Sequence, residues 1–145
     1  MQKYEVSASV RRGGEASAQA RGSEIRFDGS ARQDPVLPGP AELLAAAFAA
    51  CALKNVERFS QILRFRYDSA SIHVVAEREE HPPRIVRIRY TLRVDTDEPQ
   101  QRVDLLHLNL RKYGTVYNTL AAACSVDGEI IAAGGRDCSH SFKNS

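Results

Sequence analysis

Apolar and polar residues alternate over residues 4–10, which is the period of a strand with one buried face. The Gly13-Gly14 pair favours a chain reversal, and a weaker alternation follows over residues 16–20. A third alternating stretch covers residues 24–28. We therefore expect a three-stranded meander at the start of the chain.

The pattern then changes to a proline-rich loop and a long helix. Residues 29–40 contain three prolines and two glycines, which predicts a loop. From Ala41 to about Arg64 no residue breaks a helix, and seven of residues 41–52 are Ala, the best helix former. Glu42 lies in the first turn, where a carboxylate favours the positive end of the helix dipole. Because the first half of this helix is apolar all round, we expect it to be buried on every side.

The remaining pattern predicts further strands and helices. Strands are expected over residues 72–77 and 86–95, a helix from Asp97 to Tyr113 that Gly114 ends, a short helix over residues 115–123 and a strand over residues 128–133. The expected class is α+β, with about six strands in an antiparallel sheet packed on the long central helix. One sheet covers only one side of that helix, so a homodimer that packs two such helices together is the simplest arrangement. We expect one domain over residues 1–133 and a mobile tail over residues 134–145.

Composition narrows the possible partners and compartment. The 145 residues include 20 Lys and Arg against 18 Asp and Glu, which leaves a net charge of +2. Such a balance of charges argues against nucleic-acid binding. We expect the basic row Arg87, Arg89 and Arg93 to lie on the solvent-exposed face of a strand and to pair with Glu77 and Glu79 on its neighbour. The longest apolar run is too short to span a membrane and no signal peptide is visible, so we expect a cytoplasmic protein without a membrane partner.

Three cysteines are the main candidates for chemistry. An odd count indicates a reducing compartment rather than a disulfide-bonded scaffold. By residue type alone Cys51 would be inert packing inside the helix, since a reactive thiolate needs a nearby cation. Cys124 is expected to be structural, and Cys138 lies in the predicted tail. The spacing of Cys138 and His140 is only weakly suggestive of a metal ligand pair, and we expect no metal site.

One stretch resembles a known family. Residues 39–51, GPAELLAAAFAAC, resemble the helix-start signature of the OsmC/Ohr family of osmotically inducible and organic hydroperoxide resistance proteins. That signature is Gly and Pro, then Glu-Leu-Leu, small residues and a Cys nine positions after the Glu. The IRFD stretch before the loop, the proline turn at residues 82–83 and the Lys-Tyr pair at residues 112–113 extend the resemblance over most of residues 3–133. It implies the OsmC-like α+β fold and an intertwined homodimer whose central helices are wrapped by sheets.

The resemblance also implies a chemistry. Redox members of the family reduce organic hydroperoxides with a cysteine pair and no metal or haem cofactor. The first cysteine attacks the O–O bond and becomes a sulfenic acid, and the second forms a disulfide that an external thiol reduces. Cys51 matches the first cysteine, whereas Gly114 has the position of the second. Cys124 lies ten residues further along, up to about 15 Å away in a helix, and a disulfide needs Cα atoms within about 7 Å.

A second departure concerns the activating groups. Peroxidase members have an acidic residue directly after the Pro, and it holds an Arg that stabilises the thiolate. In this chain that position is Ala41, followed by Glu42, which the wider family also keeps. Arg26 and Arg32 are the nearest upstream candidates for the Arg.

Two hypotheses follow. The first is an OsmC-like stress-response homodimer that acts as a one-cysteine thiol peroxidase, with Cys51 as the redox centre and a small external thiol as reductant. Bulky organic hydroperoxides would then bind against Leu44, Phe48, Tyr113 and Tyr117. The second is a non-catalytic OsmC-like homodimer that binds a small hydrophobic molecule.

Overall fold

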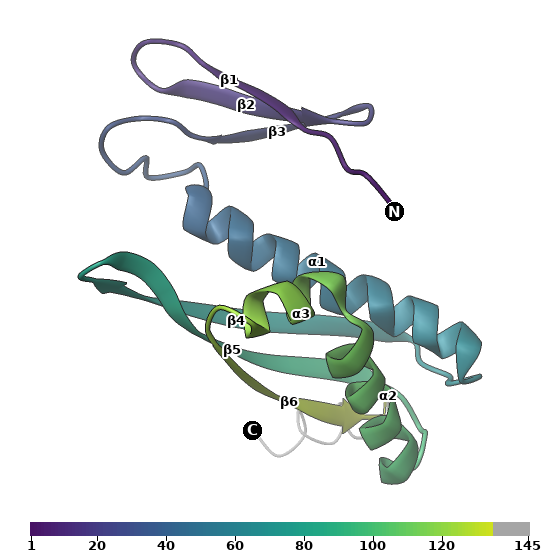
Figure 1. Ribbon diagram of the computed structural model, residues 1–145. Coiled ribbons are helices and arrows are strands. Elements are labelled where there is room, and N and C mark those ends of the chain that lie inside the picture. The colour runs from purple at the N-terminus through teal and green to yellow at the C-terminus, as the bar shows by residue number, and fades with distance from the viewer. Residues whose placement is uncertain (135–145) are drawn as a thin grey trace, which may run out of the picture. The chain divides into compact units, whose positions relative to one another are not determined.

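Six strands and three helices follow one another along residues 1–134, which this computed structural model describes (Figure 1). The predicted order of elements is confirmed. Of the predicted tail, residues 135–145, with Cys138 and His140, lie outside the described residues. The elements are β1 (Ser7–Val10), β2 (Glu15–Ala20), β3 (Ser23–Asp28), α1 (Pro40–Ile62), β4 (Ser69–Glu80), β5 (Pro83–Asp95), α2 (Gln100–Tyr113), α3 (Thr115–Ala121) and β6 (Ser125–Ala133).

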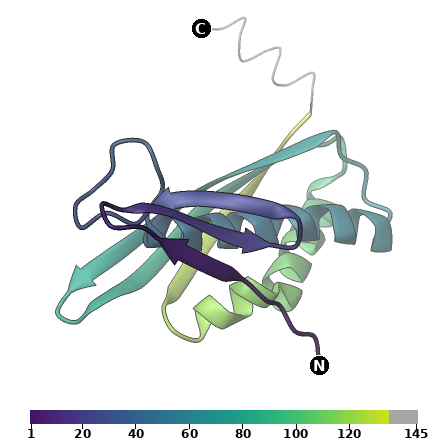
Figure 2. The same cartoon turned by 90° about the horizontal axis from the view of Figure 1, so that it is seen from above.

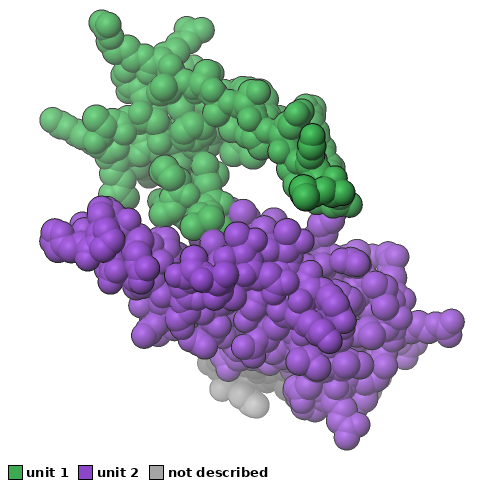
Figure 3. All heavy atoms as spheres, viewed as in Figure 1, with its two compact units in different colours: residues 1–44 green, residues 45–145 purple. Residues whose placement is uncertain are grey.

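The chain divides into two compact units, Met1–Leu44 and Ala45–Ser145 (Figure 3). The first unit contains the predicted meander, an antiparallel sheet in the order β1-β2-β3. Gly13 and Gly14 make its first turn with φ values of 102° and 106°, a conformation that glycine adopts without strain. The Asp28 carboxylate then accepts hydrogen bonds from the backbone N–H groups of Ser30 and Asp34, which orders the loop before α1.

The long helix α1 covers almost the whole predicted range of residues 41–64. Phe48, Val56 and Phe59 are buried on one side of it. The first half is apolar all round, but Ala46 and Ala50 are exposed within this chain. Within the second unit one face of α1 is therefore covered, and the predicted second copy stays a prediction.

The second unit contains the sheet β4-β5-β6, so the six strands form two three-stranded sheets rather than one. β4 and β5 form the long antiparallel hairpin seen in Figures 1 and 2. β6 runs parallel to β5, which corrects the expectation of an all-antiparallel sheet. The reason is the connection, because α2 and α3 carry the chain back to the starting edge of β5 before β6 begins.

The core of the second unit lies between this sheet and the helices. Ile88 and Leu92 of β5 and Val103 and Leu106 of α2 have no exposed surface. On the opposite face of the sheet the guanidinium groups of Arg87 and Arg89 both pair with Glu77, as predicted. Arg93, for which a pair was also predicted, forms no ion pair within residues 1–134. Glu79 pairs with Arg84 instead, because these two residues face each other across the strands. Among residues 1–134, no helix is both long and apolar enough to cross a membrane.

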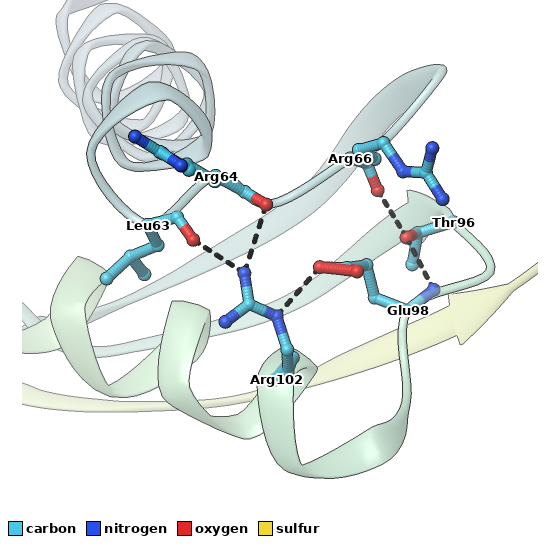
Figure 4. A network of polar contacts seen from close by, with 6 residues as sticks. All are labelled: Leu63, Arg64, Arg66, Thr96, Glu98 and Arg102. Atoms are coloured by element: carbon cyan, nitrogen blue, oxygen red, sulfur yellow. Dashed lines mark hydrogen bonds and ion pairs between the residues drawn. The ribbon is translucent and has the colours of Figure 1, made fainter.

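The C-terminal end of α1 is held by a side chain from α2 (Figure 4). Arg64 follows the helix with a φ of 52°, and the last turn of α1 contains no basic residue. The guanidinium of Arg102 donates to the carbonyl oxygens of Leu63 and Arg64 at 2.6 and 3.1 Å and pairs with Glu98 at 2.9 Å. Arg102 therefore supplies the positive charge that the end of a helix favours.

Replacing Arg102 tests this contact. Arg102→Ala should lower the free energy of unfolding by about 1–2 kcal/mol, because two carbonyl groups and Glu98 lose a charged donor at a partly exposed site. Arg93→Ala, at an exposed position of β5, is the control and should change it by less than about 0.5 kcal/mol. Denaturant titration of both variants gives the comparison, and equal losses would contradict the assignment.

Candidate functional site

The candidate site is a small pocket in the second unit that contains the sulfur of Cys51. Cys51 is half-buried on α1, one turn after the buried Phe48. The pocket has a volume of about 10 Å³, close to the lower limit for one water molecule. Its main lining residues are Phe48 and Cys51 from α1, Tyr90 from β5, His107 and Leu110 from α2, and Tyr117 from α3.

Gly114 lies against the Cys51 sulfur. It is the single residue between α2 and α3, and its φ of −72° is open to any amino acid. A Cβ atom added to Gly114 would lie 3.4 Å from Cys51 Sγ. The same atom would lie 2.9 Å from the carbonyl oxygen of Leu110 and 2.9 Å from Tyr117 Cβ, so a side chain here requires a small local shift. The position that the resemblance pairs with Cys51 is therefore next to it in the fold.

One side-chain amide also contacts the thiol. Asn55 is buried one turn after Cys51, and its Nδ2 donates to Cys51 Sγ at 3.6 Å. The Cys51 sulfur therefore has a polar partner on its own helix. The sequence pattern does not single out Asn55, although its spacing of four residues from Cys51 places both on one helix face.

Cys124 does not line the Cys51 pocket, and its sulfur has a different hydrogen-bond partner. It follows α3, is half-buried, and its Sγ donates to the carbonyl oxygen of Leu120 at 3.3 Å. Its backbone N–H donates to the same carbonyl oxygen at 2.9 Å. These contacts fit the predicted structural role of Cys124.

A cluster of polar aromatic and basic side chains borders the pocket, and of its members the sequence pattern predicts only Tyr117. The Tyr90 hydroxyl and His107 Nε2 are 2.7 Å apart, and Arg111 Nε donates to the Tyr117 hydroxyl at 3.0 Å. Burial raises the pKa of Tyr90 to about 12 and lowers the pKa of His107 from its ordinary value, with the charge of Arg111 acting in the same direction on His107. Tyr90 stands in the sequence as one of several inward residues of a strand, so no local signal identifies it.

The structure brings together only part of the predicted binding set. Phe48 and Tyr117 line the pocket, with ring centroids 5.8 Å apart. Tyr113 packs instead against Phe59, at a centroid distance of 5.7 Å, and half of its surface is exposed. Leu44 belongs to the first unit.

The predicted activating groups also belong to the first unit. Arg26 lies on β3 opposite Ser17, Arg32 lies in the loop before α1, and Glu42 lies in the first turn of α1. Their roles at Cys51 stay predictions. Within residues 1–134 no three side chains of His, Cys, Asp or Glu lie close enough together to hold a metal ion.

Comparisons with solved structures identify proteins with the same fold. Three similar solved structures show the same fold at low sequence identity. An OsmC-like protein from Mycoplasma pneumoniae has a TM-score of 0.83 and 16% identity, with 91% of this chain and 98% of that chain covered. An OsmC-like protein of unknown function from Vibrio cholerae has a TM-score of 0.76 and 17% identity, with 90% and 100% covered. The organic hydroperoxide resistance protein OhrB of Bacillus subtilis has a TM-score of 0.66 and 17% identity, with 90% and 98% covered.

Sequence comparison identifies the family directly. A search of curated proteins gives no match. A family model described as OsmC-like protein matches residues 31–129, which contain α1, the second sheet up to Glu129 and every pocket residue named above. The chain therefore belongs to the OsmC-like protein family.

Proposed function

We propose that this protein is a one-cysteine thiol peroxidase of the OsmC-like family that reduces organic hydroperoxides through Cys51 in the response to oxidative stress. The Cys51 thiolate attacks the terminal oxygen of the hydroperoxide, and the O–O bond breaks. The sulfur is oxidised to a sulfenic acid, while the alkoxide takes up a proton and leaves as an alcohol. An external small thiol then attacks the sulfenic acid, with loss of water, and a second one releases the Cys51 thiol as the external disulfide forms.

The observation that carries this proposal is the placement of the thiol. Cys51 lines a small pocket next to Gly114, at the position of the family's first cysteine, and its Sγ accepts a hydrogen bond from the Asn55 side chain. The fold shared with a hydroperoxide resistance protein is consistent with the same reaction.

Gly114 explains why an external thiol is needed. The residue next to the sulfur has no side chain, so no second thiol of the described chain is available at that position. The half-exposed Cys51 and the missing side chain together favour approach of a small thiol from outside.

Binding of a hydrophobic molecule without catalysis is the second candidate, and the apolar lining of the Cys51 pocket favours it. The pocket volume of about 10 Å³ does not separate the two candidates, because an organic hydroperoxide and a hydrophobic ligand both need more room than one water molecule.

The working form of the protein is proposed to be a homodimer. The exposed large apolar residues include Tyr4, Val6, Val10 and Ile25 in the first unit, with exposed fractions between 44% and 72%. Alanines of α1 are exposed as well. A second copy that packs against this α1 face would remove such surface from water.

Cumene hydroperoxide tests the peroxidase. We expect one addition to produce a sulfenic acid at Cys51 that dimedone traps, since the thiolate is the nucleophile. Cys51→Ser should abolish both the trapped product and the consumption of the hydroperoxide. Cys124→Ser is the matched control and should keep both. Peptide-resolved mass spectrometry separates the three cysteines, and a wild-type protein without adduct at Cys51 would end this proposal.

A thiol introduced at Gly114 tests the geometry. Gly114→Cys should form a disulfide with Cys51 after peroxide treatment, because its Cβ would lie 3.4 Å from the Cys51 sulfur. Gly114→Ser has a similar size and should form none. Both variants should lose about 1–3 kcal/mol of stability from the crowding at Leu110 and Tyr117. Mass spectrometry that finds both thiols unpaired in oxidised Gly114→Cys would contradict the placement of Gly114.

Light scattering tests the dimer. We expect a mass of twice the 16.0 kDa of one chain at micromolar concentration. Ala46→Glu places a charge on the exposed alanine face of α1 and should shift the protein to monomer, because an unpaired charge is costly in an apolar interface. Gln101→Glu, at an exposed position of α2, should leave the mass unchanged. A monomeric wild type would overturn this part of the proposal.

A further inference from the structure

Two cations flank a pair of packed aromatic rings near the end of α2. The Arg58 Cζ atom lies 5.4 Å from the centre of the Phe59 ring, and the Lys112 Nζ atom lies 5.3 Å from the centre of the Tyr113 ring. The two rings pack against each other with centroids 5.7 Å apart. Phe59 is buried, whereas Tyr113 is 49% exposed. Arg58, Phe59, Lys112 and Tyr113 therefore form one surface with an open aromatic ring and two cations, which we call the Tyr113 platform.

The Tyr113 platform adjoins the Cys51 sulfur. Tyr113 directly precedes Gly114, where an added Cβ atom would lie 3.4 Å from Cys51 Sγ. On α1, Arg58 follows Cys51 by seven residues, so the two share a helix face about 10 Å apart along the axis. Asn55, whose Nδ2 donates to Cys51 Sγ, lies between them on that face. A small molecule on the platform is thus close to the sulfur.

Among residues 1–134 neither Arg58 nor Lys112 forms an ion pair with an acidic side chain. The acidic neighbour of Arg58 in the chain, Glu57, accepts hydrogen bonds from two other side chains instead. Lys54 on the same helix is exposed and has no ion-pair partner in this part of the chain either. Positive charge is therefore in excess here, although the whole chain has a net charge of only +2. Such an excess attracts anions.

We propose that the Tyr113 platform binds the external thiol that reduces Cys51, and that this thiol carries a carboxylate. The inference rests on the proposed peroxidase function and names the chemical class of its reductant. Arg58 and Lys112 attract the carboxylate, while the exposed Tyr113 ring contacts the carbon chain. The structural alternative is that the two long side chains only cover aromatic surface.

The position of the platform favours the reductant over the hydroperoxide as its ligand. In the two-cysteine mechanism the resolving thiol belongs to the position that Gly114 has in this chain. The reducing thiol then has to arrive from outside at this side of the sulfur. Lys112 and Tyr113 immediately precede Gly114. A molecule bound to them presents its thiol where the resemblance places the second cysteine.

The reaction at the platform is ordinary thiol exchange. The bound thiol attacks the sulfur of the Cys51 sulfenic acid, so that an S–S bond forms and the S–O bond breaks. The leaving hydroxide takes up the proton of the thiol, and water forms. A second molecule of the thiol attacks the outer sulfur of this mixed disulfide, and its proton passes to the departing Cys51 thiolate. Two external thiols are oxidised to one disulfide, while Cys51 is reduced; the cations act on binding alone.

Two disulfide probes test the platform without peroxide. 5,5′-Dithiobis(2-nitrobenzoate) is an anion and 2,2′-dithiodipyridine is neutral, and each forms a mixed disulfide with a thiolate. The measurement is the ratio of their rates at Cys51, read by peptide-resolved mass spectrometry. The double variant Arg58→Gln/Lys112→Gln should lower this ratio about tenfold at low salt, because two unpaired cations are lost. A change in the thiolate fraction slows both probes alike, so the ratio reports the charge of the probe.

A matched variant and salt provide the controls. Arg66→Gln removes an exposed cation from the loop after α1 and should keep the wild-type ratio. Raising the ionic strength from about 0.01 M to about 1 M shortens the Debye length from about 30 Å to about 3 Å. The wild-type ratio should then fall to that of the double variant. An unchanged rate with the neutral probe shows that the double variant keeps the structure at Cys51.

The same variants test the reducing step. Cys51 is first oxidised with cumene hydroperoxide, and the loss of its sulfenic acid is followed with 3-mercaptopropionate and with the uncharged methyl ester of that thiol. We expect the double variant to lower the ratio of the two rates about tenfold, and Arg66→Gln to leave it unchanged. Comparing each thiol between variants cancels the different reactivities of the two thiols.

The outcomes separate this proposal from the peroxidase function. Equal probe ratios in wild type and the double variant overturn the platform, whether or not the protein reduces peroxide. A lower ratio with the disulfide probes but not with the two thiols means that another anion binds there, and the assignment to the reductant is wrong. Lower ratios in both experiments support it. If the probes show the preference but no sulfenic acid forms, the peroxidase function fails while the anion preference at Cys51 stands.

Discussion

The packing of Phe48 on the second sheet sets the geometry of the Cys51 site. Phe48 is 2% exposed and contacts the rings of Tyr90 and Tyr117. Because residues three apart share a helix face, its burial fixes the rotation of α1 and turns Cys51 toward the pocket. This rotation of α1 also places the Cys51 sulfur next to Gly114. The sulfur is then hydrogen-bonded by the Asn55 side chain. The thiol chemistry proposed for this protein therefore depends on an apolar contact one helical turn away.

The high alanine content of α1 fits the exposed face of this helix, which the proposed second copy would cover. Close approach of another surface requires small side chains, and Ala46, Ala47 and Ala50 of α1 are exposed. Phe48, Val56 and Phe59 lie on the covered side, where they fill the core with β5 and α2. One helix thus carries Cys51 on one face and exposed alanines on another, which the proposed second copy would cover.

The sequence predicts the elements well and their pairing less well. Alternation over residues 86–95, the proline at the start of α1 and Gly114 at the end of α2 are local signals, and the structure confirms them. The parallel direction of β6 is set by the route of α2 and α3, which alternation does not encode. The resemblance to the OsmC/Ohr family places Gly114 opposite Cys51, but Tyr90 and His107 meet only through folding, from positions seventeen residues apart on a strand and a helix.

The close fit of Gly128 against Tyr90 links two positions that can change only together. Any side chain at 128 needs space that the Tyr90 ring now fills, so a larger residue there requires a smaller one at 90. That exchange would remove the hydroxyl group at His107 and leave a gap beside Phe48. A substitution in the middle of β6 would therefore change the lining of a pocket built by other elements. Efforts to diversify this scaffold would have to treat positions 90 and 128 as one unit.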